Sequence, residues 1–529
     1  REQIKAVVIK EGVTTIGDYA FEGCVNLPSI TLPDSITSIG NDAFWKCSSM
    51  VSITFGKGAF INTGSAFNEC DSLKDVYITD PSAWCNSEIF QYSHPLQYGA
   101  SLHILDVNGN EVTAVVLDDS VTKIPNRAIQ NSKLKSIVLP DSLTDIGDHA
   151  FENCTGLTTV EIPDGTVSIG NDAFRNCSNL KRIDIPDSVT SMGRSAFADC
   201  SYLTSATIGN GVTSIGMYAF GGCSRLASIT IGNSVTSIGD TAFDNCRALT
   251  SIVLPHSVTS IGSSAFEACS NLTSITLGSG LTEIGERAFC RCQKLQDVVI
   301  PASVASIGDS AFAECKALTS IKIPAGVTSI GTQTFYQCSG LTSIELSDGI
   351  TSIGLNAFSS CSNLTSITIP ASVTRIDGGA FINCGKLKEI TFEGDAPDIS
   401  TELNESGYGV FSGVSATAYY PVGNPTWTAD KLQNYGGKLT WVSYVPDVPI
   451  TGTCGENLTW ELKDGTLTIS GTGAMTDYSF NTAPWYNYRE QIGTVVIKEG
   501  VTSIGNDAFD HCMALQSIEI PSTVTEMGF

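Results

Sequence analysis

Phenylalanine recurs every 23 residues from Phe151 to Phe381 without a slip, and a cysteine follows each one three positions later. A fixed period of this length marks a repeat architecture, in which each unit packs against its two neighbours. Aligned on the phenylalanines, the unit is L-x-x-I-x-I-P-x-x-V-T-S-I-G-x-x-A-F-x-x-C-x-x, as in the stretch from Leu364 to Lys386. We therefore expect a solenoid with one coil per repeat.

The pattern within the unit predicts two short strands and about one helical turn per coil. L-x-x-I-x-I is the strand signature of leucine-rich repeats, whose period is roughly 20–29 residues. V-T-S-I-G alternates apolar residues at period two, which predicts a second strand. A-F-x-x-C is predicted to be the helical turn, with Phe and Cys on one buried face, and the Asp, Asn or Ser that often follows the glycine should cap it. The expected fold is a β-rich solenoid with β caps at its ends.

The cysteines indicate a ladder and not a disulfide framework. Fifteen of the 18 occupy the repeat position, where side chains in register fit disulfide geometry poorly and serve as small buried hydrophobic groups. A zinc site is disfavoured because Cys290 and Cys292 are the one close cysteine pair and the five histidines are scattered. We expect no metal and no cofactor.

Charge narrows the range of partners. Lys and Arg number 29 against 54 Asp and Glu, a net charge of −25, which argues against nucleic acid and anionic membrane surfaces as partners. No run of 18 apolar residues is present, so we expect no membrane insertion. Only 16% of residues are charged, and a surface rich in Ser, Thr, Asn and Gly suits a secreted scaffold.

Breaks in the period divide the chain into segments. We expect a first block of repeats at 1–85, an insertion with a degenerate repeat at 86–130, the main array at 131–391, a C-terminal cap at 392–446, a linker at 447–453, a β-hairpin N-terminal cap at 454–488 and the start of a second array at 489–529. The second array is inferred from a direct match, since R-E-Q-I-x-x-V-V-I-K-E-G-V-T-x-I-G begins at both Arg1 and Arg489, an offset of 489 − 1 = 488 residues. This duplication predicts a longer protein built from tandem modules.

The motif I-P-x-x-V-T-S-I-G-x-x-A-F-x-x-C-x-x-L-T-S-I resembles the BspA-like leucine-rich repeats of bacterial surface proteins, and residues 1–391 and 489–529 carry it. The resemblance implies a secreted or cell-wall-attached protein that binds host extracellular-matrix proteins, host cell-surface proteins or glycans, or other microbes. It implies no catalytic residues. The sequence also contains no G-x-S-x-G, G-x-x-x-x-G-K-[ST], G-x-G-x-x-G or H-E-x-x-H motif, so we expect no enzyme.

Binding is predicted on the exposed strand positions that flank the first inward isoleucine, because stacked coils align them into one long face. The candidate contacts on this face, most of them charged departures from the usual Ser and Thr, are Arg182, Asp184, Asp297, Lys322, Glu345, Thr368 and Glu389. The alternative is that Ser and Thr ladders merely solvate the strands. Trp427, Trp441 and Trp485 lie outside the regular coils and are candidates for stacking on a glycan, with end-capping as the alternative.

Two classes of function fit these features. The first is a non-enzymatic extracellular binding scaffold, an adhesin that contacts host proteins, glycans or other microbes through its repeat face. The second is a structural stalk or fibre in which neighbouring modules are the partners, or a spacer that presents another domain.

Overall fold

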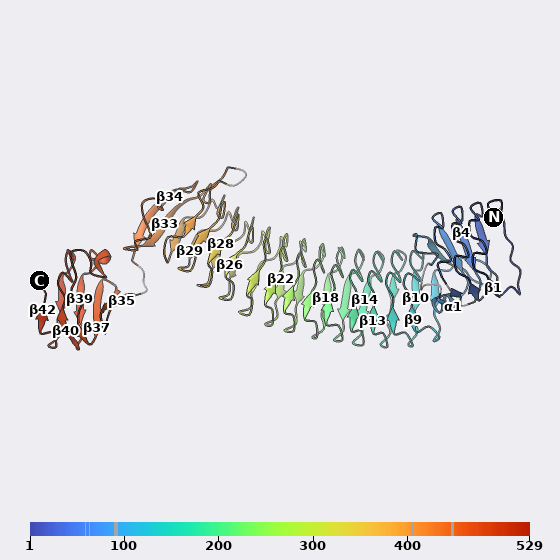
Figure 1. The fold of residues 1–529 in the computed structure, drawn as a ribbon, viewed down its shortest axis with the longest axis horizontal. Helices are drawn as coiled ribbons and strands as arrows, with labels where there is room; N and C mark the ends of the chain where they lie inside the picture. The colour runs from blue at the N-terminus through green and yellow to red at the C-terminus, as the bar shows by residue number, and fades with distance from the viewer. Residues whose placement is uncertain (59, 63, 89–93, 404–406, 446–448, 529) are drawn as a thin grey trace.

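The computed structural model describes residues 1–58, 60–62, 64–88, 94–403, 407–445 and 449–528. The chain forms a long array of stacked coils, followed at its C-terminal end by a smaller β unit (Figure 1). The predicted β-solenoid of leucine-rich repeats is confirmed.

Each regular coil contributes one strand to each of two parallel walls. The first strands are β2 (Ser29–Thr31), β4 (Ser52–Phe55), β6 (Asp75–Ile78), β7 (Ser101–Ile104), β8 (Ala114–Val116), β10 (Ser136–Val138), β12 (Thr159–Val160), β14 (Arg182–Ile185), β16 (Ser205–Ile208), β18 (Ser228–Thr230), β20 (Ser251–Val253), β22 (Ser274–Thr276), β25 (Ser320–Lys322), β27 (Ser343–Glu345), β29 (Ser366–Ile369) and β31 (Glu389–Phe392). The second strands are β1 (Thr15–Ile16), β3 (Ser38–Ile39), β5 (Ile61–Asn62), β9 (Lys123–Ile124), β11 (Asp145–Ile146), β13 (Ser168–Ile169), β15 (Ser191–Met192), β17 (Ser214–Ile215), β19 (Ser237–Ile238), β21 (Ser260–Ile261), β23 (Glu283–Ile284), β24 (Ser306–Ile307), β26 (Ser329–Ile330), β28 (Ser352–Ile353), β30 (Arg375–Ile376) and β32 (Asp398–Ile399). Within the regular arrays, pairing joins equivalent positions of successive repeats, as in Ser251 with Ser274.

The predicted helical turn is wrong, because A-F-x-x-C forms consecutive tight turns in place of a helix. In the coil of Phe174, Asp172 and Asn176 have left-handed backbones with φ of 52° and 55°, which no α-helix contains. The backbone N–H groups of Asp172, Phe174 and Asn176 donate to carbonyls of the next coil at 2.8, 2.7 and 2.8 Å. The turns thus build a third hydrogen-bonded wall, and α1 (Pro81–Cys85) is the one α-helix of the described residues.

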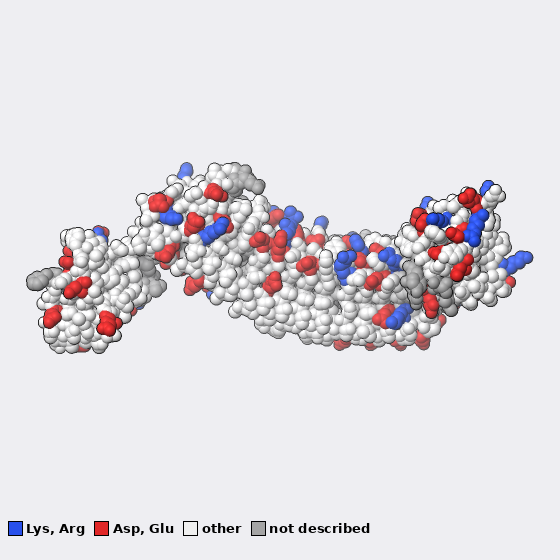
Figure 2. Space-filling model, viewed as in Figure 1, with Lys and Arg blue, Asp and Glu red and all other residues white. Residues whose placement is uncertain are grey.

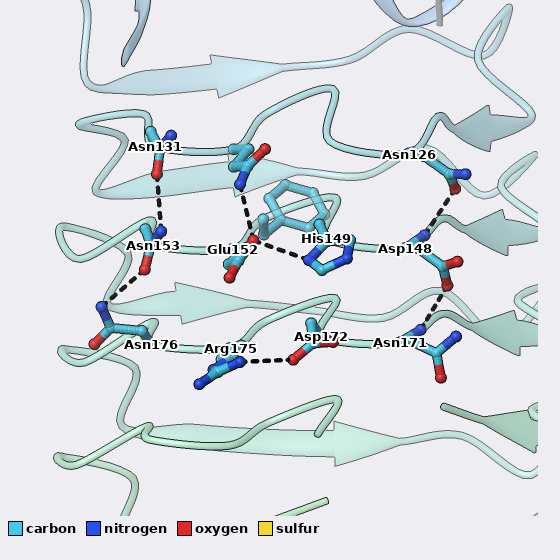
Figure 3. A network of polar contacts seen from close by, with 12 residues as sticks. Asn126, Asn131, Asp148, His149, Glu152, Asn153, Asn171, Asp172, Arg175 and Asn176 are labelled. Carbon is cyan, nitrogen blue, oxygen red and sulfur yellow. Dashed lines mark hydrogen bonds and ion pairs between the residues drawn. The ribbon is translucent and has the colours of Figure 1, made fainter. Parts of the chain in front are cut away.

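The Asp, Asn or Ser after the glycine also acts differently from the predicted helix cap. The Asp148 side chain accepts a hydrogen bond from the backbone N–H of Asn171 at 2.7 Å (Figure 3). The Asn171 side chain accepts one from the backbone N–H of Arg194 at 2.9 Å. A parallel ladder links Asn131, Asn153 and Asn176 through side-chain amides, at 2.9 Å per step. Both ladders therefore join successive coils, the first by accepting from backbone N–H groups and the second through bonds between side-chain amides.

The phenylalanine ladder forms the spine of the core. From Phe151 to Phe381 the rings are fully buried and stacked, with centroids 4.9–5.7 Å apart. Beside it, the repeat cysteines are buried, apart from the half-buried Cys512. Most of their thiols donate to a phenylalanine carbonyl of an earlier coil, as Cys177 does to Phe151 at 3.1 Å, and Cys154 donates to the Ile129 carbonyl instead. The predicted burial of the phenylalanine and cysteine ladders is confirmed.

Two further segments extend or follow the array. β33 (Ser415–Pro421) and β34 (Lys438–Tyr444) add to the first wall in parallel, beyond β31. The smaller unit has its own core and contains β35 (Ile450–Gly455), β36 (Leu458–Lys463), β37 (Thr466–Gly471), β38 (Gly473–Ala474), the 3-10 turn η2 (Tyr486–Tyr488), β39 (Thr494–Ile497), β40 (Val501–Ile504), β41 (Ser517–Glu519) and β42 (Glu526–Met527). The hairpin therefore starts at Ile450, inside the predicted linker, whose residues 447 and 448 lie outside the described part of the chain.

Candidate interaction surface

The outward side chains of the first strands form two columns that run along the array. In β20, Ser251 and Val253 point outward while Ile252 is buried. Parallel pairing places Ser251 beside Ser274 and Val253 beside Thr276, and the same register recurs in neighbouring coils. We call this surface the strand face. Charged residues are scattered over the array and separated by broad uncharged areas (Figure 2).

A break in the sheet opens a groove on the strand face. Asp297 bridges to Ser274 and Ser320, but residues 298–300 of its coil lie outside any strand. The resulting groove has a volume of about 750 Å³. Three predicted contact residues line it: Asp297, Lys322 and Glu345.

The groove has an apolar wall as well as this charged rim. Val299 lines it with 82% of its surface exposed, and the other small apolar residues along it are Ala302, Pro324 and Ala325. The residue most common at the position of Val299 in other coils is threonine, as Thr276 is in the preceding coil. In the groove, this exposed valine offers a partner an apolar contact directly beside the charged residues Asp297, Lys322 and Glu345.

Lys322 and Glu345 form an ion pair across the groove rim. They lie directly opposite each other on β25 and β27, and their side chains are 70% and 65% exposed. Such an exposed pair contributes only about 0–1 kcal/mol to stability. A ligand can therefore compete for either charge at little cost to the fold.

The charged residues on β14 form a separate patch. Arg182 donates two hydrogen bonds to Asp184, at 2.6 and 3.0 Å. These bonds lower the pKa of the Asp184 carboxyl and keep it ionised. Six strand spacings separate Asp184 from Lys322, or about 29 Å at roughly 4.8 Å per spacing. The seven predicted residues therefore do not converge on one pocket.

Thr368 and Glu389 lie further along the strand face. Both are exposed, on the adjacent strands β29 and β31. Glu389 lines a second hollow of about 690 Å³ together with Lys388, Asn434 and Lys438. This hollow is polar and open, so it offers hydrogen-bonding groups but little apolar contact.

Exposed valines on the strand face were not among the predicted contacts. Val116, Val138, Val253 and Val299 occupy the same outward column and are 72%, 56%, 64% and 82% exposed. The sequence signal was available, since each stands where the repeat usually has threonine. The prediction selected mainly charged departures from Ser and Thr and so did not include these valines.

Two of the three candidate tryptophans are buried. Trp485 is fully buried and its indole N–H donates to the Ala508 carbonyl at 2.7 Å. Trp427 is buried against Phe392, with ring centroids 4.9 Å apart. The burial of these two rings favours the end-capping alternative, and their role in glycan stacking stays a prediction. Trp441 is half-buried, and its role stays a prediction.

Within the described residues, no cluster of His, Cys, Asp and Glu side chains is arranged to hold a metal ion. No helix in that part of the chain has the length and hydrophobicity needed to cross a membrane. The groups that this surface offers to a partner are the apolar groove and the exposed ion pairs described above.

The stacked coils and the strand face define a leucine-rich-repeat solenoid. The chain matches the BspA type leucine rich repeat region over residues 1–100, 108–209, 192–319, 282–408 and 482–529, and it belongs to this family. No curated protein matches it.

Among solved structures, the chain is similar to a leucine-rich repeat protein from Bacteroides ovatus, with 23% identity and a TM-score of 0.52 over 82% of this chain and 97% of that one. It is also similar to a leucine rich cell surface protein from Faecalibacterium prausnitzii, with 31% identity and a TM-score of 0.41 over 64% of this chain and 96% of that one. A leucine-rich repeat protein of T. pallidum has 28% identity and a TM-score of 0.27 over 35% of this chain and 77% of that one. The first of these similarities supports the fold.

Proposed function

We propose that this protein is a non-enzymatic extracellular binding scaffold, a bacterial cell-surface adhesin whose strand face contacts a host matrix or cell-surface molecule or another microbe. Membership of the BspA type repeat family supports this proposal. The observation that carries it is the open groove lined by Asp297, Val299, Lys322 and Glu345.

The groove favours a protein partner over a glycan. Its apolar wall around Val299 suits a side chain or an extended peptide segment, and its exposed Lys322 and Glu345 provide charges of both signs. Glycan binding commonly uses an exposed aromatic face, but Trp427 and Trp485 are buried. The interface with such a partner would extend from the groove along the columns of Ser and Thr. Its affinity would come from the buried area and from complementary shape.

A binding screen of the full chain against immobilised host matrix proteins and a glycan array tests the proposal. Once a ligand is found, Lys322→Glu and Glu345→Lys should each weaken binding about tenfold or more, the loss expected of an interface contact worth about 1.4 kcal/mol or more. Both variants should keep the wild-type melting temperature, because the ion pair is exposed. The double variant Lys322→Glu/Glu345→Lys keeps the ion pair but swaps the positions of its two charges. It therefore tests whether binding depends on which position carries each charge.

A structural stalk or fibre is the second candidate. The observation that favours it is the recurrence of the sequence of residues 1–17 at 489–505, with β33–β34 and the hairpin at 450–488 acting as covers of successive arrays. In a stalk, the partners are neighbouring modules. In the related spacer function, the array presents another domain. Folded protein that binds nothing in either panel would favour this function.

A further inference from the structure

One sequence occurs twice in this chain in two different environments. Residues 1–17 and 489–505 are identical at 14 of 17 positions. In the second copy Val501 is fully buried, whereas the matching Val13 is 42% exposed. Val496 is half-buried, whereas the matching Val8 is 85% exposed. The first copy thus exposes residues whose counterparts in the second copy are buried or half-buried.

The hairpin at 450–488 is what covers the second copy. β37 pairs in parallel with β39, placing Thr468 beside Val496 and Ile469 beside Ile497. β38 pairs in the same sense with β40, which contains Val501. The residues that match β39 at the N-terminus, 6–9, lie in no strand. The same residues therefore form a strand in the copy that pairs with the hairpin and form none in the copy that does not.

A tryptophan completes this cover, because it stacks on the first phenylalanine of the second copy where a preceding coil would place its own phenylalanine ring. Trp485 stacks on Phe509 with centroids 5.8 Å apart, and its indole N–H donates to the Ala508 carbonyl. The matching residues at the N-terminus are Phe21 and Ala20. Phe21 stacks on Phe44 at 5.4 Å and is only partly buried, and Ala20 is exposed.

The same device occurs at a second break in the array. The fully buried Trp84 of α1 donates its indole N–H to the Ala128 carbonyl at 2.8 Å, and Ala128 holds the same repeat position as Ala508. Two independent coil stacks are thus begun by a tryptophan bonded to this alanine. Ala20 holds this position in the first coil.

The sequence differences between the copies do not obstruct such a cover. Lys5 replaces Gly493, and a Cβ at Gly493 would meet its nearest atom, the Gly465 oxygen, at 3.9 Å. That is ordinary van der Waals contact, so the Cβ of a lysine at this position fits beside β37 without a clash. The other two differences are Ala6 for Thr494 and Thr15 for Ser503, which change little volume.

We propose that residues 4–21 form a docking edge for a β-hairpin unit of the kind formed by residues 450–488, joined to the array as that unit is joined to residues 489–505. The hairpin adds a parallel strand to residues 6–9, which then become a strand themselves, and its tryptophan stacks on Phe21 and donates to the Ala20 carbonyl. This inference is independent of binding at the strand face.

Hydrogen–deuterium exchange on a duplicated hairpin tests the proposal. Residues 450–488 are fused directly ahead of Arg1 in the full chain, so that Tyr488 precedes Arg1 as it precedes Arg489. The amides of residues 6–16 should exchange at least about tenfold more slowly in the fusion than in the unfused chain, because new ladder hydrogen bonds protect them. The three sequence differences separate these peptides from those of 489–505.

The control carries Trp485→Ala and Ile469→Asp in the added hairpin alone, and it should lose the protection. Protection of β39 serves as an internal reference that the original hairpin remains folded in every variant. Unchanged exchange at residues 6–16 in the fusion would overturn the proposal. Protection that appears in the unfused chain and rises with its concentration would make a second copy the occupant, and would overturn the assignment to an adjoining hairpin.

Discussion

Removing one ring from the phenylalanine ladder is the sharpest test of the core. Phe266 is fully buried, and its ring stacks on Phe243 at 5.2 Å and on Phe289 at 5.5 Å. A buried Phe→Ala change costs about 3–5 kcal/mol, from lost transfer energy and the cavity left behind. Each stacked pair adds about 0.5–1.5 kcal/mol, so Phe266→Ala should fall in the upper part of that range.

The assay must resolve individual coils, because long repeat arrays do not unfold in one cooperative step. Native-state hydrogen exchange at the amides of Phe243 and Phe266 meets this need, since both donate to the next coil at 2.8 Å. A loss of about 4 kcal/mol corresponds to roughly a thousandfold faster exchange where opening of these coils limits it. Protection in distant coils, such as that of Phe151, should change far less.

Phe21→Ala is the matched control. Phe21 is only partly buried and stacks on Phe44 alone, so its loss should cost about 1–2 kcal/mol, less than half of a fully buried ring. Equal effects at Phe21 and Phe266, or a cost below about 1 kcal/mol at Phe266, would refute the ladder as the source of stability.

Three further predictions concern the polar ladder and the buried titratable groups. Asn171→Ala removes the acceptor of the Arg194 N–H, so it should cost about 1 kcal/mol in local exchange, while Asn171→Asp should not. Burial lowers the pKa of His94 to about 4, so the free energy of unfolding should fall as the pH drops from about 6.5 to 4, because the unfolded chain takes up the proton first. His94→Gln should flatten this dependence in urea titrations, and a profile that matches wild type would contradict the assignment. Burial raises the pKa of the Cys200 thiol to about 12, so stability should decline as the pH rises above about 9 and thiol reagents should label this cysteine only after unfolding.

The sequence was sufficient for the features that follow from periodic burial. An apolar residue that recurs every 23 positions must face the same interior in every coil, so the strands, the strand face and the Phe and Cys ladders could all be predicted. The same logic located Asp297, Lys322 and Glu345 on one face. It could not show that they meet at a groove, because the groove depends on where one coil leaves the sheet.

The helical turn could not be excluded by periodicity. A spacing of three between Phe and Cys suits a helical turn and also suits consecutive tight turns. One signal did point to the turns, since Asn153, Asn176 and Gly222 precede a repeat cysteine and favour left-handed backbone. Yet Ala268 and Arg291 adopt the same conformation, which shows that hydrogen bonds between coils, and not local preference, determine it.

The burial of the tryptophans illustrates the same limit. Composition marks Trp427 and Trp485 as unusual, but only the packing shows that one fills the end of the array and the other begins the next stack. The packing of these two rings supports a structural role for them, whereas the exposed apolar positions of the strand face are valines inside the coils.

The measurement that tests the strand face most directly compares two matched valine variants for binding to whichever host matrix ligand the full chain captures. Val299→Thr and Val253→Thr both restore the common threonine at an exposed strand position, but only Val299 lines the groove. We predict that Val299→Thr weakens binding about tenfold or more while Val253→Thr retains wild-type affinity, with melting temperatures unchanged in both. Equal affinities in the two variants and wild type would contradict a binding role for the groove.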